Sequence, residues 1–139
     1  MPLNKQGYGV KSNSYQAAGE LAGITRLVDS FYENMNAFPE AKTIRQMHPE
    51  DLGESRKKLT YFLSGWLGGP KLYSQHYGGV SIPNSHRHLL IGEIEGDAWL
   101  HCMEKAIANQ PYEESFKTYL LAELKVPVGR IKAVCAEYN

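Results

Sequence analysis

The sequence lacks the long apolar runs and the charge imbalance that mark several large classes of protein. No apolar run approaches the roughly 20 residues that a membrane-spanning helix needs. Residues Met1–Val10 contain no apolar core of signal-peptide length, so we expect a cytoplasmic protein with no membrane partner. Basic and acidic residues balance at 15 each, which gives no electrostatic reason to expect a nucleic acid partner.

Cysteine and β-strand signals are also scarce. The two cysteines, Cys102 and Cys135, each lie in a segment of helical periodicity, as expected of small core residues in a reducing compartment. No segment shows a sustained two-residue alternation, so the sequence predicts an all-α protein. A chain of 139 residues suffices for one hydrophobic core. We expect residues 1–13 to form a flexible lead-in and residues 14–139 to form a single domain.

Apolar residues recur instead at the spacing of amphipathic helices. The clearest stripe consists of Ile24, Leu27, Val28, Phe31 and Met35, with Tyr32 at its buried edge. Pro127 predicts an interruption near the carboxyl end, because proline removes an interior hydrogen bond from a helix. The predicted helices cover residues 23–36, 41–47, 52–66, a short piece that begins near 83, 95–109, 112–124 and 128–138.

One histidine lies on an apolar face. In the helix expected near Pro83, Ile82, His86 and Leu89 are spaced i, i+4 and i+7, so His86 points along the apolar side. A buried imidazole without a partner costs about 1–3 kcal/mol. Taken alone, this pattern favours a core histidine bonded to a backbone carbonyl, and a metal ligand is the alternative. His88 lies about 200° round the helix, so the two cannot share one zinc ion.

Several motifs follow one another in order along residues 14–107. The segments are Leu27–Met35, His48–Leu52, Trp66–Tyr73 and Asp97–Leu100. Together they resemble the second helix, the distal helix with its following turn, and the start of the penultimate helix of the group II truncated haemoglobins. The resemblance implies a truncated globin fold, which is a two-over-two helical sandwich around haem b.

The resemblance also implies which residue holds the iron. The proximal histidine of the family lies thirteen positions before the tryptophan of the last motif. Counting back from Trp99 gives His86, the residue that the helical spacing also indicates. The family commonly has an arginine directly before this histidine, whereas here Ser85 precedes His86 and Arg87 precedes His88. His88 is therefore the alternative ligand.

Further roles follow from the resemblance. Three polar side chains would donate hydrogen bonds to the ligand on the distal side, namely Tyr32, His48 and Trp99. The distal pocket would be completed by Phe31, Ser55, Leu59 and Phe62. The haem would contact Ile82, Leu89 and Ile91, and its propionates would meet Lys58 and Tyr73. Taken singly, Tyr32 and Trp99 would be interpreted as core aromatics, and His48 and Lys58 as solvated polar residues.

The implied function is reversible binding of dioxygen and of other diatomics such as nitric oxide and carbon monoxide. Oxygen transport and nitric oxide detoxification are further expectations, and a peroxidase-like or ligand-sensing haem protein is the alternative. Whether the protein is an enzyme stays open. No flavin- or nicotinamide-binding motif is present, so nitric oxide turnover would need a separate reductase. A monomer and a weak dimer are equally compatible with the sequence.

Overall fold

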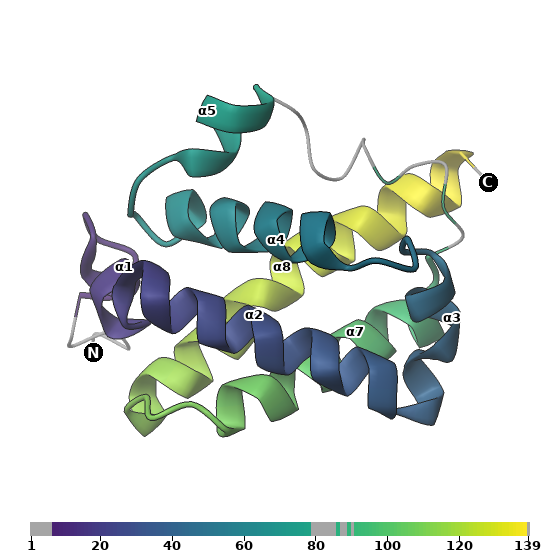
Figure 1. Cartoon of the computed structure of the whole chain (residues 1–139), viewed down its shortest axis with the longest axis horizontal. Helices are drawn as coiled ribbons and strands as arrows, with labels where there is room; N and C mark the ends of the chain where they lie inside the picture. Colours follow the sequence, from purple (N-terminus) through teal and green to yellow (C-terminus); the bar gives the residue numbers. More distant parts are fainter. Residues whose placement is uncertain (1–6, 79–85, 87–88, 90, 139) are drawn as a thin grey trace.

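The computed structural model describes residues 7–78, 86, 89 and 91–138, and within this part of the chain every regular element is a helix (Figure 1). The all-α class is therefore confirmed. The elements are α1 (Asn13–Ala17), α2 (Glu20–Ala37), the 3-10 turn η1 (Pro39–Ala41), α3 (Lys42–Gln46), α4 (Gly53–Trp66), α5 (Leu72–Tyr77), α7 (Glu93–Ala108) and α8 (Glu114–Tyr138). None of the helices in the described ranges is long and apolar enough to cross a bilayer.

Four long helices form the body of the molecule. Helix α2 packs against both α4 and α7, and α7 packs against α8. Figure 1 shows the pair α2 and α4 lying over the pair α7 and α8, as in a two-over-two sandwich. The short helix α3 contacts α2 and α7 and closes one end of this arrangement.

Helix α2 forms where the apolar stripe predicted it, three residues longer at its start and one at its end. The stripe residues Ile24, Leu27, Val28 and Phe31 have no exposed surface, and they form the centre of the core. Gly23 lets the preceding chain approach the helix, because a Cβ at this position would lie 2.0 Å from the carbonyl oxygen of Ala18. Only a residue without a Cβ permits this close approach.

Helix α4 ends at Trp66, where the sequence predicted its end, and Gly68-Gly69-Pro70 follows it. Gly68 has a φ of +93°, and its α-carbon approaches the backbone of Lys11 so closely that a Cβ would lie 2.0 Å from the Lys11 carbonyl oxygen. Ser64 closes the turn by donating to the Pro70 carbonyl oxygen at 2.7 Å. Helix α5 follows, and the sequence did not predict it, because its six residues carry no apolar stripe.

The predicted interruption of the last helix is wrong. Helix α8 runs from Glu114 to Tyr138 with Pro127 inside it. The buried stripe of Leu124, Val128 and Cys135 continues across the proline. Burial of this stripe against the core offsets the roughly 3 kcal/mol that an interior proline costs a helix.

The segment before α1 is tied to α8. The Tyr8 ring is buried against Phe116 and Tyr119, with ring centroids 5.2 Å apart in both pairs. Its hydroxyl lies 2.9 Å from Ser115 Oγ. Residues 7–12 thus contribute a core side chain, and the expected division of the chain at residue 13 stays a prediction.

Candidate functional site

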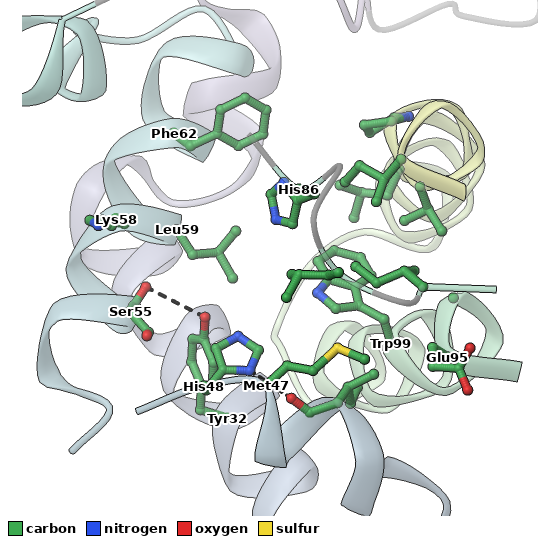
Figure 2. A pocket seen from close by; sticks show the side chains of 18 of the residues that line it. Tyr32, Met47, His48, Ser55, Lys58, Leu59, Phe62, His86, Glu95 and Trp99 are labelled. Carbon is green, nitrogen blue, oxygen red and sulfur yellow. Dashed lines mark hydrogen bonds between the residues drawn. The ribbon is translucent and has the colours of Figure 1, made fainter. Parts of the chain in front are cut away.

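A cavity of about 450 Å³ lies between α2, α3, α4, α7 and α8 (Figure 2). Its wall is mainly apolar, with a small number of polar side chains that converge on the interior. Volumes of roughly 300–1,000 Å³ with this composition are typical of cofactor and ligand sites. Most of the residues predicted for the site line this cavity: Tyr32, His48, Ser55, Lys58, Leu59, Phe62, Tyr73, His86, Leu89, Ile91 and Trp99.

Phe31 lies behind the cavity wall instead of in it. Its side chain is fully buried, and its ring centroid lies 4.9 Å from those of Tyr32 and Trp99. Phe31 therefore supports both aromatic residues from the core side. The predicted haem contact Ile82 and the alternative ligand His88 lie outside the described residues.

Tyr32 presents a neutral hydroxyl at the cavity. Its side chain is 4% exposed, and burial raises the pKa of the phenol to about 12. The hydroxyl donates to the Ser55 carbonyl oxygen at 3.5 Å, which is at the outer limit of a hydrogen bond (Figure 2). At neutral pH Tyr32 is thus a protonated donor held by one weak bond, which a better acceptor can replace.

His48 follows α3 and lies beside Tyr32, with the two ring centroids 5.7 Å apart. Its Nδ1 lies 2.8 Å from the Ile44 carbonyl oxygen. Because a carbonyl oxygen only accepts, Nδ1 carries the proton, and Nε2 of the neutral ring is an acceptor. Burial lowers the pKa of His48 below its usual 6.5, which favours this neutral form. His48 was expected to donate, but in this tautomer it donates into the cavity only after protonation.

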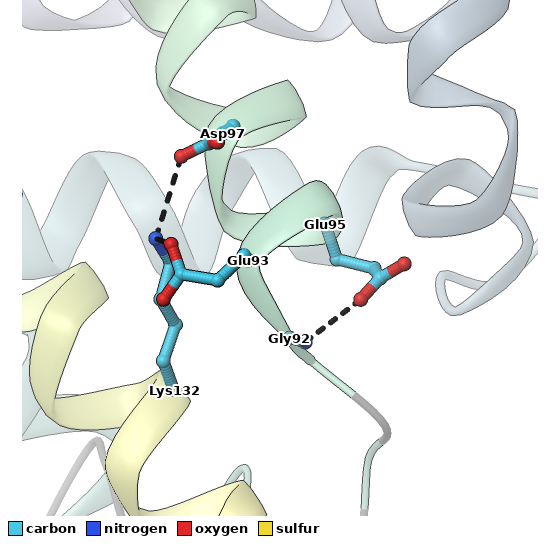
Figure 3. A network of polar contacts seen from close by, with 5 residues as sticks. All are labelled: Gly92, Glu93, Glu95, Asp97 and Lys132. Carbon is cyan, nitrogen blue, oxygen red and sulfur yellow. Dashed lines mark hydrogen bonds and ion pairs between the residues drawn. The ribbon is translucent and has the colours of Figure 1, made fainter.

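Trp99 reaches the cavity from α7, whose first turn is fixed at two places. The Gly92 amide donates to Glu95 Oε1 at 2.7 Å, which caps the helix (Figure 3). Lys132 of α8 pairs with Glu93 Oε2 at 3.1 Å and with Asp97 Oδ1 at 3.4 Å. The Lys132 contacts join the start of α7 to α8, close to Trp99.

The absence of a side chain at Gly96 allows this pairing. A Cβ at position 96 would lie 2.1 Å from Lys132 Cε, so the lysine stem occupies the space above the glycine. Gly96 and Glu95 also line the cavity. The α7–α8 contact therefore forms part of the cavity wall.

His86 enters the cavity from the chain between α5 and α7. It is half-buried, and Figure 2 shows its ring near Phe62 and Leu59, on the far side of Leu59 from Tyr32 and His48. Its carbonyl oxygen accepts from the Leu89 amide at 2.9 Å and from Cys135 Sγ at 3.1 Å. The helix predicted near Pro83 lies mostly outside the described residues, and of its members His86 lies in a turn and Leu89 in a bend.

Lys58 and Tyr73 lie at the cavity rim on α4 and α5. Lys58 is exposed, and its Nζ lies 5.4 Å from the centroid of the Tyr77 ring. The Tyr73 and Tyr77 ring centroids are 4.9 Å apart. A cation and a hydroxyl at this rim are suited to carboxylate groups that project from a ligand inside the cavity.

The sequence reasoning missed a group of apolar residues that also line the cavity. They are Ile44, Met47, Leu63, Leu124, Pro127, Val128 and Ile131. Those on α8 share one face at helical spacing across Pro127. The apolar stripe on α8 therefore already indicated these residues, but the break assumed at Pro127 divided the stripe in two.

The residues present fit a haem group. The cavity is apolar and large enough for a planar macrocycle, it has one imidazole on one side, and it has a cation at its rim. Within the described part of the chain, no three His, Cys, Asp or Glu side chains gather as metal ligands. An iron ion held by a porphyrin needs only an axial ligand from the protein, and a single histidine supplies it.

Comparisons with known proteins agree with this architecture. The family model described as bacterial-like globin matches residues 13–128. The group 2 truncated hemoglobin YjbI of Bacillus subtilis is 35% identical over 112 residues, which cover 81% of this chain and 82% of that protein.

Solved structures agree as well. The group II 2-on-2 hemoglobin of Agrobacterium tumefaciens has a TM-score of 0.81 at 31% identity, over 86% of this chain and 92% of its own. A truncated oxygen-avid haemoglobin of Bacillus subtilis has a TM-score of 0.76 at 32% identity, over 85% and 97% respectively.

Proposed function

This chain belongs to the bacterial-like globin family as a group II truncated haemoglobin, and from this premise we propose that it binds haem b through His86 and reversibly binds dioxygen. One observation carries the proposal: a single cavity brings His86 together with Tyr32, His48 and Trp99. When bound, the haem supplies an iron site for a diatomic ligand. The protein contributes the axial imidazole, the polar groups around the ligand and the apolar wall.

The polar groups act on the ligand by hydrogen bonding. The Tyr32 hydroxyl is a neutral donor at every pH below about 12, and the Trp99 indole N–H is a donor at all pH values. A hydrogen bond to a partly negative ligand oxygen contributes about 1.5–3 kcal/mol. One such bond slows ligand release by about 10- to 150-fold.

The apolar groups keep water away from the ligand. Leu59 and Phe62 project from α4, and Val128 from α8. Ser55 is the smallest side chain on the α4 side of the cavity, so we assign ligand entry to this point. Lys58 and Tyr73 would hold the two propionates at the rim, where a cation offsets their charge.

The truncated haemoglobin of Bacillus subtilis with a solved structure is oxygen-avid, which supports dioxygen as the ligand of this chain. Nitric oxide and carbon monoxide would compete for the same position, and oxidation of nitric oxide would need electrons from a separate reductase. We retain a cytoplasmic location and a monomer or weak dimer as proposals.

A peroxidase-like activity is the second candidate, and the neutral His48 favours it. Its Nε2 is an acceptor beside the Tyr32 ring. Hydrogen peroxide carries protons and dioxygen does not. A neutral imidazole at this position can therefore take a proton from hydrogen peroxide. The same cavity thus suits both an aprotic diatomic and a protic peroxide.

Hemin titration tests the proposed function. We expect the purified protein to bind one hemin with a Soret band, and His86→Gly to lose haem. Added imidazole should restore the spectrum of His86→Gly, because it fills the space of the missing ring. His88→Ala is the matched control and should retain haem. If His88→Ala loses haem and His86→Gly does not, the axial ligand is His88. If no variant or parent binds hemin, the proposed function is wrong.

A further inference from the structure

We propose that Tyr77, hydrogen bonded to Glu54, is a surface site at which small phenols are oxidised at the expense of hydrogen peroxide consumed in the cavity. The proposal rests on the proposed haem site and adds a substrate class and a second location on the molecule. The observations come from an aromatic cluster on α4 and α5, defined here as Tyr61, Tyr73, His76 and Tyr77.

The cluster connects the cavity to the surface. Tyr73 lines the cavity, and its ring centroid lies 4.9 Å from that of Tyr77. The His76 ring follows at 6.3 Å from Tyr77, and Tyr61 lies 4.7 Å from His76. Centroid separations of 4.5–7 Å are those of aromatic rings in contact. Tyr77 is thus one ring contact away from the cavity wall, and it is half-exposed to solvent.

Glu54 gives Tyr77 a built-in proton acceptor. The Tyr77 hydroxyl donates to Glu54 Oε1 at 2.6 Å. A phenol that loses an electron becomes strongly acidic, so a base within 2.6–3.2 Å lets the proton leave in the same step. The hydrogen bond to Glu54 raises the pKa of Tyr77 to about 12. The phenol therefore keeps its proton until it is oxidised.

The Lys58 ammonium group lies beside the same ring. Its Nζ lies 5.4 Å from the Tyr77 centroid, a distance typical of a cation–π contact. The ring is thereby attached to α4, the helix that also carries Glu54. A neutral tyrosyl radical brings no new charge next to this ammonium group, whereas a radical cation would.

When bound, the haem would supply the site at which hydrogen peroxide is reduced to two waters, which requires two electrons and two protons. For each electron, the Tyr77 O–H bond breaks, the electron would pass through Tyr73 into the cavity, and the proton moves to Glu54 and then to solvent. A small phenol at the surface then transfers a hydrogen atom to the Tyr77 oxygen. In sum, one hydrogen peroxide and two phenols give two waters and two phenoxyl radicals.

The test uses haem-loaded protein mixed with hydrogen peroxide. A nitroso spin trap followed by peptide mass spectrometry locates the radical, and freeze-quench electron paramagnetic resonance measures its yield. We expect the adduct on Tyr77 in the parent protein. Tyr77→Phe keeps the ring and should lose both this adduct and the oxidation of guaiacol. Tyr61→Phe is the matched control, because among the described residues its hydroxyl has no carboxylate partner, and it should match the parent.

Glu54→Gln tests the proton step separately. The amide retains the size of the carboxylate but is a poor base, so radical formation at Tyr77 should slow by about tenfold or more. An adduct confined to Tyr73 or Tyr61, or guaiacol oxidation that is unchanged in Tyr77→Phe, would overturn the proposal. The Soret band and carbon monoxide binding of each variant report the haem site independently, so a loss of either identifies a failure of the proposed function.

Discussion

The cavity has an inner wall and an outer rim that are built differently. The inner wall consists of Tyr32 on α2 and Trp99 on α7, whose rings both pack against the fully buried Phe31 ring behind them. The outer rim consists of Lys58 on α4 and Tyr73 on α5, which are exposed and half-exposed respectively. The inner wall packs on the folding core, so loss of a ring there alters stability together with ligand binding. A change at the rim alters only the chemistry of the site.

Truncation of Phe31, the core ring behind the inner wall, should give the largest effect. Phe31→Ala leaves a cavity at a fully buried position, and we expect a loss of about 3–5 kcal/mol in the free energy of unfolding. Chemical denaturation of both proteins, followed by circular dichroism, measures this loss. Tyr73→Phe at the rim is the control and should change stability by less than about 0.5 kcal/mol. Equal losses in the two variants would remove the distinction between wall and rim.

Removal of the Tyr32 hydroxyl should separate stability from ligand binding within the inner wall. Tyr32→Phe keeps the ring and removes only a hydrogen bond of 3.5 Å to Ser55, so stability should change by less than about 1 kcal/mol. Dioxygen release should become about 10- to 150-fold faster, because a donor to the ligand is lost. Stopped-flow kinetics measures the release, with Tyr119→Phe as the control on α8. Unchanged release would exclude Tyr32 from ligand stabilisation.

Substitutions at the contact between α7 and α8 should change the free energy of unfolding by a smaller amount, and their effects should not add. Gly96→Ala places a Cβ where the Lys132 stem lies. The stem is flexible and can move, but it then loses its pairs with Glu93 and Asp97. We expect Gly96→Ala to change the free energy of unfolding by less than about 0.5 kcal/mol, because the roughly 0.5–1 kcal/mol that alanine gains over glycine within a helix offsets the lost ion pairs. Lys132→Met should lose less than about 1 kcal/mol, since ion pairs near the surface contribute little.

A double-mutant cycle checks this reasoning. Both substitutions act on the same contact, so the loss in the double variant should be smaller than the sum of the single losses. Thermal unfolding of the four proteins provides the measurement. Additive losses would mean that Gly96 and Lys132 stabilise the protein independently.

The sequence predicted the elements whose burial pattern is simple. The stripe on α2 and the predicted end of α4 at residue 66 both appear in the structure. Helix α5 was missed because its residues carry no apolar stripe, and it is held instead by contacts with α4 such as that between Tyr61 and His76. The continuity of α8 was missed because a local rule about Pro127 was given more weight than the stripe of buried residues on both sides of it.

The sequence predicted the candidate site about as well as it predicted the fold. Tyr32, His48 and Trp99 were chosen by resemblance, and the fold brings all three to one cavity. The position of Phe31 behind the wall depends on the angle between α2 and α7, which no local pattern encodes. The tautomer of His48 depends on the Ile44 carbonyl oxygen, so only the three-dimensional structure reveals it.

Substitution of His48 should change the free energy of unfolding least. The direction of the pH dependence follows from burial of the ring. Because burial lowers the pKa of His48 in the folded state, the unfolded chain, whose histidine titrates near pH 6.5, binds the proton first as the pH falls. The free energy of unfolding should therefore decrease as the pH falls below about 6.5, and the decrease should stop once the folded protein is also protonated. His48→Gln can still donate to the Ile44 carbonyl oxygen but does not titrate, so it should lack this part of the decrease.

Chemical denaturation at a series of pH values between 5 and 8, at equal haem loading, measures the difference. Parallel curves of unfolding free energy against pH for the two proteins would mean that His48 is as well solvated in the fold as in the unfolded chain. The assignment of a neutral His48 with an acceptor at Nε2 would then be contradicted.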